Sequence, residues 1–185
     1  MKRKVLLSLL VLTMVITITG CGKTDSKKDN STEKKVEEKE EKLIKLTAKD
    51  KEYFTTFKTV DDKFVQTNPK YNQVDSEELG VFITFQYIES TKEAYDYAKT
   101  HNFLGNKYAE GEVKEYKWNN YDGYSYGIAE NELYFRILLE DNKDNCIVLS
   151  AFVGPKNKKV DFSKLLDSED FKKFLNSIEF KKESK

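Results

Sequence analysis

The side chains best suited to nucleophilic or acid–base chemistry are few in this chain: one histidine, His101, and two cysteines, Cys21 and Cys146. His101 falls in the last turn of a predicted helix, where the partial negative charge of the helix terminus favours a cation, so we predict a capping role for it. The H-E-x-x-H, C-x-x-C and Gly-rich phosphate-loop patterns are absent. We therefore predict no catalytic residue, no metal site and no cofactor.

Cys146 opens the apolar run "CIVLSAFV". A lone cysteine in an exported protein can be a reactive thiol, but apolar neighbours favour a buried small hydrophobe, and we predict the latter.

Three groups of carboxylates could in principle bind calcium: Asp61-Asp62, Asp75 with Glu77-Glu78, and Glu140-Asp141 with Asp144. In the third group, Lys143 takes a ligand position and no bidentate Glu follows at the required distance, so we predict polar turns.

An aromatic trio, Tyr116, Trp118 and Tyr121, is the candidate ligand-binding face. If Asn119-Asn120 forms a two-residue turn, Trp118 faces Tyr121 across two strands and the three rings share one face. Exposed, they could stack on a sugar or grip a peptide. Alternatively, a helix covers this face and the rings belong to the core.

The first residues carry an export signal. Met1-Lys2-Arg3-Lys4 precedes an apolar run of roughly 14 residues, 5–18, which is followed by the small residues Thr19 and Gly20. A helix that spans a membrane needs about 20 apolar residues, so a cleaved signal peptide over 1–20 is favoured over a permanent transmembrane anchor.

Ile18-Thr19-Gly20-Cys21 resembles the lipobox of bacterial lipoproteins: an aliphatic residue, a small residue, Gly or Ala, and then Cys. Ile18 replaces the more usual Leu. The resemblance implies that a diacylglycerol is attached to the thiol of Cys21, that cleavage occurs just before it, and that the new amine is then acylated in many bacteria. It also implies that the protein is exported and anchored by lipid to the outer face of the cytoplasmic membrane.

Residues 21–44 read as a charged linker, disordered or partly helical. Between residues 22 and 42 the one aliphatic residue is Val36, too little apolar area to offset the entropy of ordering. Favourable Glu-to-Lys pairs four residues apart nevertheless allow a helix over 33–46. We predict one globular domain over 45–181 and a tail over 182–185.

Dense aromatic and β-branched residues predict strands in this domain, several of them apolar on both faces. The predicted strands are 52–60, 79–89, 112–118, 121–129, 132–140, 145–153 and a terminal "IEF". One helix is predicted after the capping box that begins at Ser90, ending before Gly105. A second begins near Asp167 or Ser168 and buries an apolar stripe.

This order of elements, closing in "FKKFLNSIEF", resembles the PsbP-like family found in small bacterial lipoproteins. The resemblance rests on Leu175, Ser177, Ile178 and Phe180 and covers roughly residues 45–181. It implies an α+β fold in which helices flank both faces of an antiparallel meander, an α/β/α sandwich. It also implies a scaffold or binding accessory with no catalytic residues to carry over.

Charge and motifs together favour a binding protein. The 32 basic and 32 acidic residues become 29 and 32 once Lys2, Arg3 and Lys4 leave with the leader, a net charge of −3 that gives no basis for nucleic-acid binding. We predict a membrane-anchored binding or assembly accessory with a protein or cell-wall ligand. The alternatives are an envelope enzyme whose acid and base are carboxylates such as Glu115 or Asp122, and a structural lipoprotein.

Overall fold

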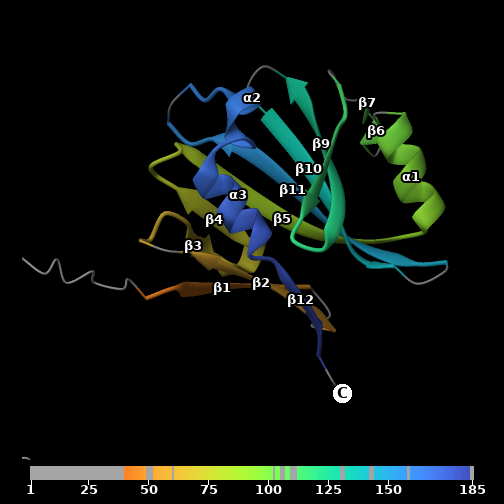
Figure 1. The fold of residues 1–185 in the computed structure, drawn as a ribbon, viewed down its shortest axis with the longest axis horizontal. Helices are drawn as coiled ribbons and strands as arrows, with labels where there is room; N and C mark the ends of the chain where they lie inside the picture. Colours follow the sequence, from red (N-terminus) through yellow and green to blue (C-terminus); the bar gives the residue numbers. More distant parts are fainter. Residues whose placement is uncertain are drawn as a thin grey trace, which may run out of the picture. The chain divides into compact units, whose positions relative to one another are not determined.

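A computed structural model describes residues 40–48, 52–59, 61–101, 103–104, 107–108, 112–129, 132–141, 144–157 and 159–183 (Figure 1). These residues lie in one compact unit, Glu38–Lys185. The predicted signal peptide, the lipobox and most of the predicted linker lie outside the described residues.

The larger sheet that the described residues form is antiparallel, with strand order β3-β4-β5-β11-β10-β9-β8. Its strands are β3 Val65–Asn68, β4 Gln73–Ser76, β5 Val81–Ser90, β8 Lys114–Trp118, β9 Tyr121–Ala129, β10 Glu132–Asp141 and β11 Cys146–Pro155. The predicted strands over 79–89, 112–118, 121–129, 132–140 and 145–153 are confirmed. Asn119 has a φ of 54°, and Trp118 lies opposite Tyr121, as the predicted turn requires.

A smaller antiparallel sheet has the order β1-β2-β12, with β1 Lys42–Thr47, β2 Tyr53–Thr59 and β12 Glu179–Lys182. Strands β2 and β12 confirm the predicted strand over 52–60 and the terminal strand. Strand β1 replaces the last residues of the predicted linker or helix, which is a correction. Ile44 and Leu46 are buried while Lys45 and Thr47 are exposed, and a period of two fits a strand that is covered on one face.

The helices of the described residues are short: α1 Lys92–Thr100, α2 Phe162–Leu165, α3 Glu169–Asn176 and the 3₁₀ turn η1 Pro69–Tyr71. A small hairpin joins β6 Phe103–Leu104 to β7 Lys107–Tyr108. The side chain of Thr91, rather than the predicted Ser90, caps α1 by accepting from Ala94 N. Ser168 caps α3 as predicted, accepting from Phe171 N.

The predicted fold class, an α/β/α sandwich with helices on both faces of one sheet, is wrong. The described residues form two antiparallel sheets with few helices, and β1, β2 and β12 lie below the larger sheet in Figure 1. The apolar runs do need cover on both faces, but strands β1 and β2 provide much of it. The alternating pattern of β1 cannot form the continuous apolar stripe of a covering helix.

Two buried clusters occupy the two faces of the larger sheet. Leu133, Phe135 and Ile137 of β10 face the main core, which also contains Phe57 of β2 and Phe174 of α3. The intervening Tyr134 and Leu138 belong to the second cluster on the opposite face. This second cluster includes Tyr95 of α1, Tyr124, Tyr126, Cys146 and Val148. Alternation along β10 therefore defines both cores.

Side chains cap both edges of the smaller sheet. On the β1 edge, the Asn72 amide donates to Thr47 O (2.8 Å) and accepts from Thr47 N (3.1 Å), and Gln66 Nε2 donates to Lys45 O (2.9 Å). On the β12 edge, Phe180 N donates to the Tyr121 hydroxyl (3.1 Å). These bonds occupy backbone groups that an edge strand would otherwise offer to another chain.

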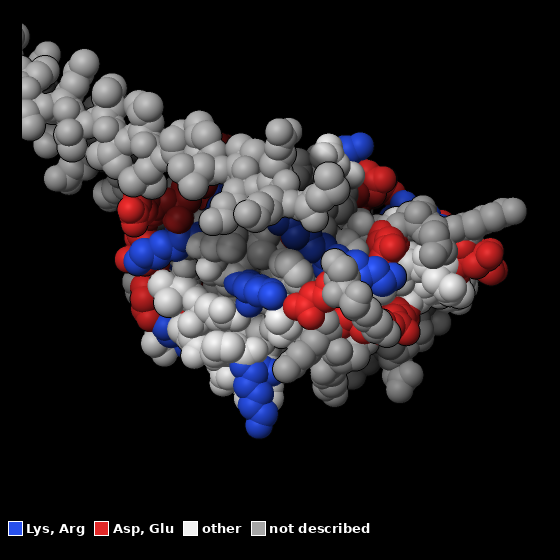
Figure 2. Space-filling model, turned by 90° about the horizontal axis from the view of Figure 1, so that it is seen from below, with Lys and Arg blue, Asp and Glu red and all other residues white. Residues whose placement is uncertain are grey.

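The outer face of the smaller sheet carries both signs of charge. Lys45 lies over the Phe54 ring (3.9 Å to its centroid) and pairs with Glu183 (3.5 Å). Lys58 pairs with Glu41 (3.7 Å) and Lys181 with Glu179 (3.4 Å). Figure 2, which views the molecule from below Figure 1, shows lysines and acidic residues interspersed there. A surface of this kind has no large field of one sign.

Candidate functional site

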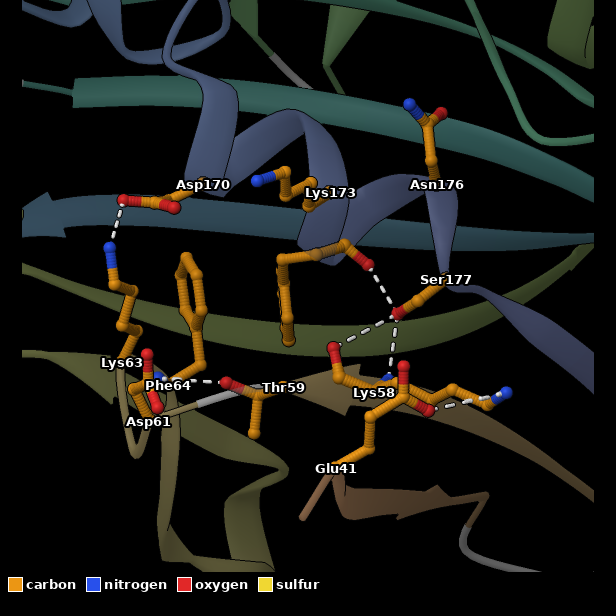
Figure 3. A pocket seen from close by; sticks show the side chains of 11 residues that line it. Glu41, Lys58, Thr59, Asp61, Lys63, Phe64, Asp170, Lys173, Asn176 and Ser177 are labelled. Atoms are coloured by element: carbon orange, nitrogen blue, oxygen red, sulfur yellow. Dashed lines mark hydrogen bonds and ion pairs between the residues drawn. The ribbon is translucent and has the colours of Figure 1, made fainter. Parts of the chain in front are cut away.

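A cleft of about 620 Å³ lies between α3 and the end of β2 (Figure 3). We call it the α3 cleft. Residues from the end of β2, from the β2–β3 connection and from α3 with its C-cap converge on it, together with Glu41 just before β1. They are Glu41, Lys58, Thr59, Asp61, Lys63, Phe64, Asp170, Lys173, Phe174, Asn176 and Ser177. The cleft combines an apolar floor with a charged rim, which suits a ligand that has both apolar and polar parts.

The floor is a stack of aromatic rings. The Phe64 and Phe174 rings are stacked with centroids 4.1 Å apart, and Phe174 also stacks on Phe57 at 4.5 Å. Phe64 N donates to the Thr59 hydroxyl (3.3 Å), which fixes the backbone that carries the ring. Because these rings also belong to the main core, the floor is rigid.

The polar rim comes from the outward face of α3. The spacing of three residues between Asp170, Lys173 and Asn176 places them on one side of the helix, opposite the buried stripe. Across the cleft, the turn residues Asp61 and Asp62 both have positive φ, 64° and 55°. Aspartate tolerates this conformation better than most residues, so this turn can bring Lys63 back toward α3.

Ion pairs neutralise most of the rim. Lys63 Nζ lies 2.5 Å from Asp170 and 3.5 Å from Glu78, and the hydrogen bond to Asp170 outweighs burial and raises the pKa of Lys63. In the part of the chain that the structure describes, Lys173 makes no ion pair. Lys173 therefore offers the α3 cleft an exposed cation for an acidic group of a ligand.

Ser177 lies in the cleft but serves the fold. Its hydroxyl accepts from Lys58 N (2.7 Å) and lies 2.7 Å from Phe174 O and 3.2 Å from Lys58 O. It thereby ties the end of α3 to β2. A hydroxyl held by three backbone groups, with no general base beside it among the described residues, has no means of nucleophilic activation.

Of the aromatic trio predicted as a ligand-binding face, Trp118 belongs to the main core, and Tyr116 and Tyr121 are partly buried and pack against it. Trp118 is 3% exposed, packs against Phe135 (5.5 Å between centroids) and stacks on Tyr116 at 5.4 Å. Tyr121 is half-buried, and its hydroxyl caps β12. Asn119 binds Asn176 and Ile178 at the end of α3. The second alternative from the sequence, that the rings belong to the core, therefore applies to Trp118, while Tyr116 and Tyr121 are only partly buried.

A nucleophile pattern that the sequence predictions omit is Gly-Tyr-Ser-Tyr-Gly at 123–127, which fits G-x-S-x-G. The pattern activates a serine only at a sharp turn between a strand and a helix. Here Ser125 lies within β9, paired with Phe135 and Lys114 on either side, and is 2% exposed. Ser125 is therefore an ordinary strand residue, and its position in β9 does not activate it as a nucleophile.

Glu115 and Asp122, the carboxylates of the enzyme alternative, line one small pocket of about 270 Å³ beside Tyr95. Both are exposed. Glu115 pairs with Lys99 (3.1 Å) and Asp122 lies 3.9 Å from Lys117. Carboxylates in exposed pairs with lysines do not form an acid and base in a protected site, so this arrangement does not favour an enzyme.

The other side chains that could take part in chemistry, those of Cys146, His101 and Asp75, have structural roles instead. Cys146 is 2% exposed in the second cluster, as predicted. His101 follows α1, and its Nδ1 lies 3.0 Å from Tyr97 O, which agrees with the predicted cap. Burial raises the pKa of Asp75, but hydrogen bonds from Gln73, Lys156 and Thr67 outweigh it and lower that pKa overall.

The acidic groups pair with lysines. Lys156 binds both Asp75 (3.0 Å) and Glu77, Lys42 binds Asp62, and Lys182 lies 3.9 Å from Glu140. Among the described residues, no group of three or more His, Cys, Asp or Glu side chains is placed to hold a metal ion. None of the described helices is both long and apolar enough to cross a membrane.

Comparison with other proteins gives no relative: no family model, curated protein or solved structure matches the chain.

The α3 cleft was not predicted from the sequence because its two sides come from segments more than 100 residues apart. The visible signal was the polar side of α3, Asp170, Lys173 and Asn176.

Proposed function

We propose that this chain is a lipid-anchored protein of the cell envelope, held at the outer face of the cytoplasmic membrane through Cys21. The observation that carries the proposal is the order of a charged start, an apolar run and Ile18-Thr19-Gly20-Cys21. A diacylglycerol on the thiol gives two acyl chains, which is enough for stable membrane residence. The charged segment behind Cys21 then acts as a spacer between the membrane and the domain.

We propose that the domain works as a binding or assembly accessory and that the α3 cleft takes its partner. Three features support this. The cleft has a rigid aromatic floor, Phe64 and Phe174, an exposed cation at Lys173, and a rim of both charges. A peptide segment with an apolar side chain next to a carboxylate matches this chemistry. The mixed charge in Figure 2 does not favour a polyanion as the partner.

The anchor is tested by Cys21→Ala in the native host grown with labelled palmitate. We expect the wild type to incorporate label and appear as the cleaved form. Cys21→Ala should incorporate essentially none and should accumulate as the longer precursor, because both acylation and cleavage require the thiol. Cys146→Ala is the matched control and should label like the wild type. Equal labelling and processing of Cys21→Ala and the wild type would refute the anchor.

The cleft is tested by charge reversal on adjacent positions of α3. Lys173→Glu places a negative charge in the α3 cleft, whereas Lys172→Glu changes the same charge on a neighbouring side chain that does not line it. In crosslinking from the intact cell surface, we expect Lys173→Glu to reduce partner recovery about tenfold, the loss of one ion pair at an interface. Lys172→Glu should retain it. Equal recovery with both variants would exclude the α3 cleft as the binding site.

A further inference from the structure

Arg136 is placed unusually for an arginine. It lies in β10, in the middle of the larger sheet, on the face opposite the main core. It is half-buried, and its Nε is shielded from solvent with no hydrogen-bond partner. Within the part of the chain that the structure describes, its one hydrogen bond to a side chain runs from Nη1 to the Tyr124 hydroxyl at 3.3 Å. Among the described residues, no carboxylate forms an ion pair with Arg136.

A second polar atom on this face is also without a partner. Tyr126 is 1% exposed, and its hydroxyl is buried and makes no hydrogen bond. The register, with Arg136 opposite Tyr124 and Tyr134 opposite Tyr126, makes Arg136 and Tyr126 diagonal neighbours on one face. Burial raises the pKa of Tyr126, and the positive charge of Arg136 opposes that rise. An unpaired guanidinium N–H and an unpaired phenol in one buried place each carry a desolvation cost, and proteins normally offset it with a partner.

The registers place Arg136 within a polar row that crosses the sheet. Gln86 lies opposite Ser150, Ser150 opposite Arg136, and Arg136 opposite Tyr124, so their side chains share one face. Gln86 at one end is exposed, while at the other end Tyr124 is covered by Tyr95 of α1, with centroids 5.3 Å apart. The row is therefore exposed at Gln86, whereas Ser150 and the end toward α1 are covered.

Apolar rows flank the polar row on both sides. Phe152, Tyr134 and Tyr126 form a line of rings with centroid separations of 5.1 and 6.0 Å. On the other side lie Val148, opposite Ile88, and Leu138, opposite Val148. The nearby acidic residues have their own partners, since Asp96 binds Lys92 (2.7 Å) and Asp122 lies near Lys117. Among the described residues, these two carboxylates therefore do not balance the charge of Arg136.

We propose that Arg136 and Tyr126 form a binding site for the carboxylate group of a small ligand. The fork of Nε and Nη matches a planar carboxylate in bidentate geometry, and the Tyr126 hydroxyl provides a third donor. Because Nε and this hydroxyl are shielded from solvent, the side chains that cover them must shift to admit the ligand. A single guanidinium balances one negative charge, which favours a carboxylate over a phosphate dianion. The body of the ligand extends along the polar row toward Gln86, between the aromatic and aliphatic rows. This site is separate from the α3 cleft and does not depend on the membrane anchor.

The test uses the Nε–H nuclear resonance of Arg136 in the full-length chain, with acetate as the probe. The chain contains two arginines, Arg3 and Arg136, so Arg136→Lys assigns the signal. We expect a saturable downfield shift on titration with acetate and no such shift with chloride at equal ionic strength. Tyr126→Phe should weaken acetate binding about tenfold, the loss of one hydrogen bond to a charged group. Tyr134→Phe, a change of the neighbouring ring, should leave it unaltered.

Three results would overturn the proposal. The Nε–H signal could fail to respond to acetate, it could respond equally to chloride, or Tyr126→Phe could bind acetate as the wild type does. The last result would indicate that the two unpaired groups are satisfied by water alone. The fluorescence of Trp118, the single tryptophan, should confirm that each variant is folded.

Discussion

Phe174→Ala is expected to destabilise the domain by about 3–5 kcal/mol, the usual cost of removing a fully buried phenylalanine. Phe174 is 1% exposed and lies at the centre of the main core, stacked on both Phe57 and Phe64. Its ring also approaches Phe85, with centroids 6.4 Å apart. Removing it leaves a cavity that the surrounding rings and the two sheets cannot close. Urea unfolding followed by Trp118 fluorescence measures the effect.

The control for Phe174 is Tyr71→Ala, which also removes an aromatic ring. Tyr71 is 57% exposed, so its loss should change the free energy of unfolding by no more than about 0.5 kcal/mol. The comparison bears on function as well, because Phe174 forms the floor of the α3 cleft. A loss below about 1 kcal/mol for Phe174→Ala would mean that the smaller sheet and α3 do not pack as described.

Gly123→Ala is expected to destabilise the domain by about 3 kcal/mol, because β9 has no room for a methyl group at this position. A Cβ built on Gly123 overlaps the Arg136 backbone oxygen and the Trp118 ring, and lies 2.9 Å from a second carbon of that ring. The backbone of β10 is fixed by its pairing with β9 and β11. Trp118 is buried against Phe135 and cannot move aside. Thermal unfolding and a shift in Trp118 emission would both report the strain.

Gly154→Ala is the matched control for Gly123. A Cβ on Gly154 would also be crowded, at 2.6 Å from atoms of the Phe82 ring. Those atoms are the far end of a half-buried side chain, which can rotate away. We therefore expect a cost below about 1 kcal/mol. If Gly123→Ala were as mild as Gly154→Ala, Trp118 would have to be mobile, and its assignment to the core would be wrong.

The strands of the larger sheet were predictable because their signals are local. Asn119-Asn120 fixes a turn, and the runs on either side then pair with Trp118 opposite Tyr121. Ser168 and the stripe of Phe171, Phe174 and Leu175 similarly define α3. Such features depend on residues within a few positions of one another, so the sequence alone contains them.

The fold class was not predictable in the same way. The sequence requires cover for both faces of the central strands but does not say which segment provides it. Lys42 and Lys45 each follow a glutamate by four residues, which suits a helix. Over residues 43–47, buried and exposed side chains alternate, which suits a strand. The exposed pairs stabilise a helix by only a few tenths of a kcal/mol, whereas burying Ile44 and Leu46 contributes about 1.5–3 kcal/mol each. Burial, a tertiary effect, therefore decides for β1.

The candidate sites divide along the same line. The sequence by itself determined the proposed localisation at the membrane, since Ile18-Thr19-Gly20-Cys21 lies at the end of the apolar run. It also determined that His101 caps a helix and that Cys146 is buried. Only the tertiary structure decided that Trp118 is core, that Lys63 meets Asp170, and that Arg136 lies beside Tyr126 with no carboxylate partner among the described residues. The physical reason is that burial and pairing depend on segments brought together from distant parts of the chain.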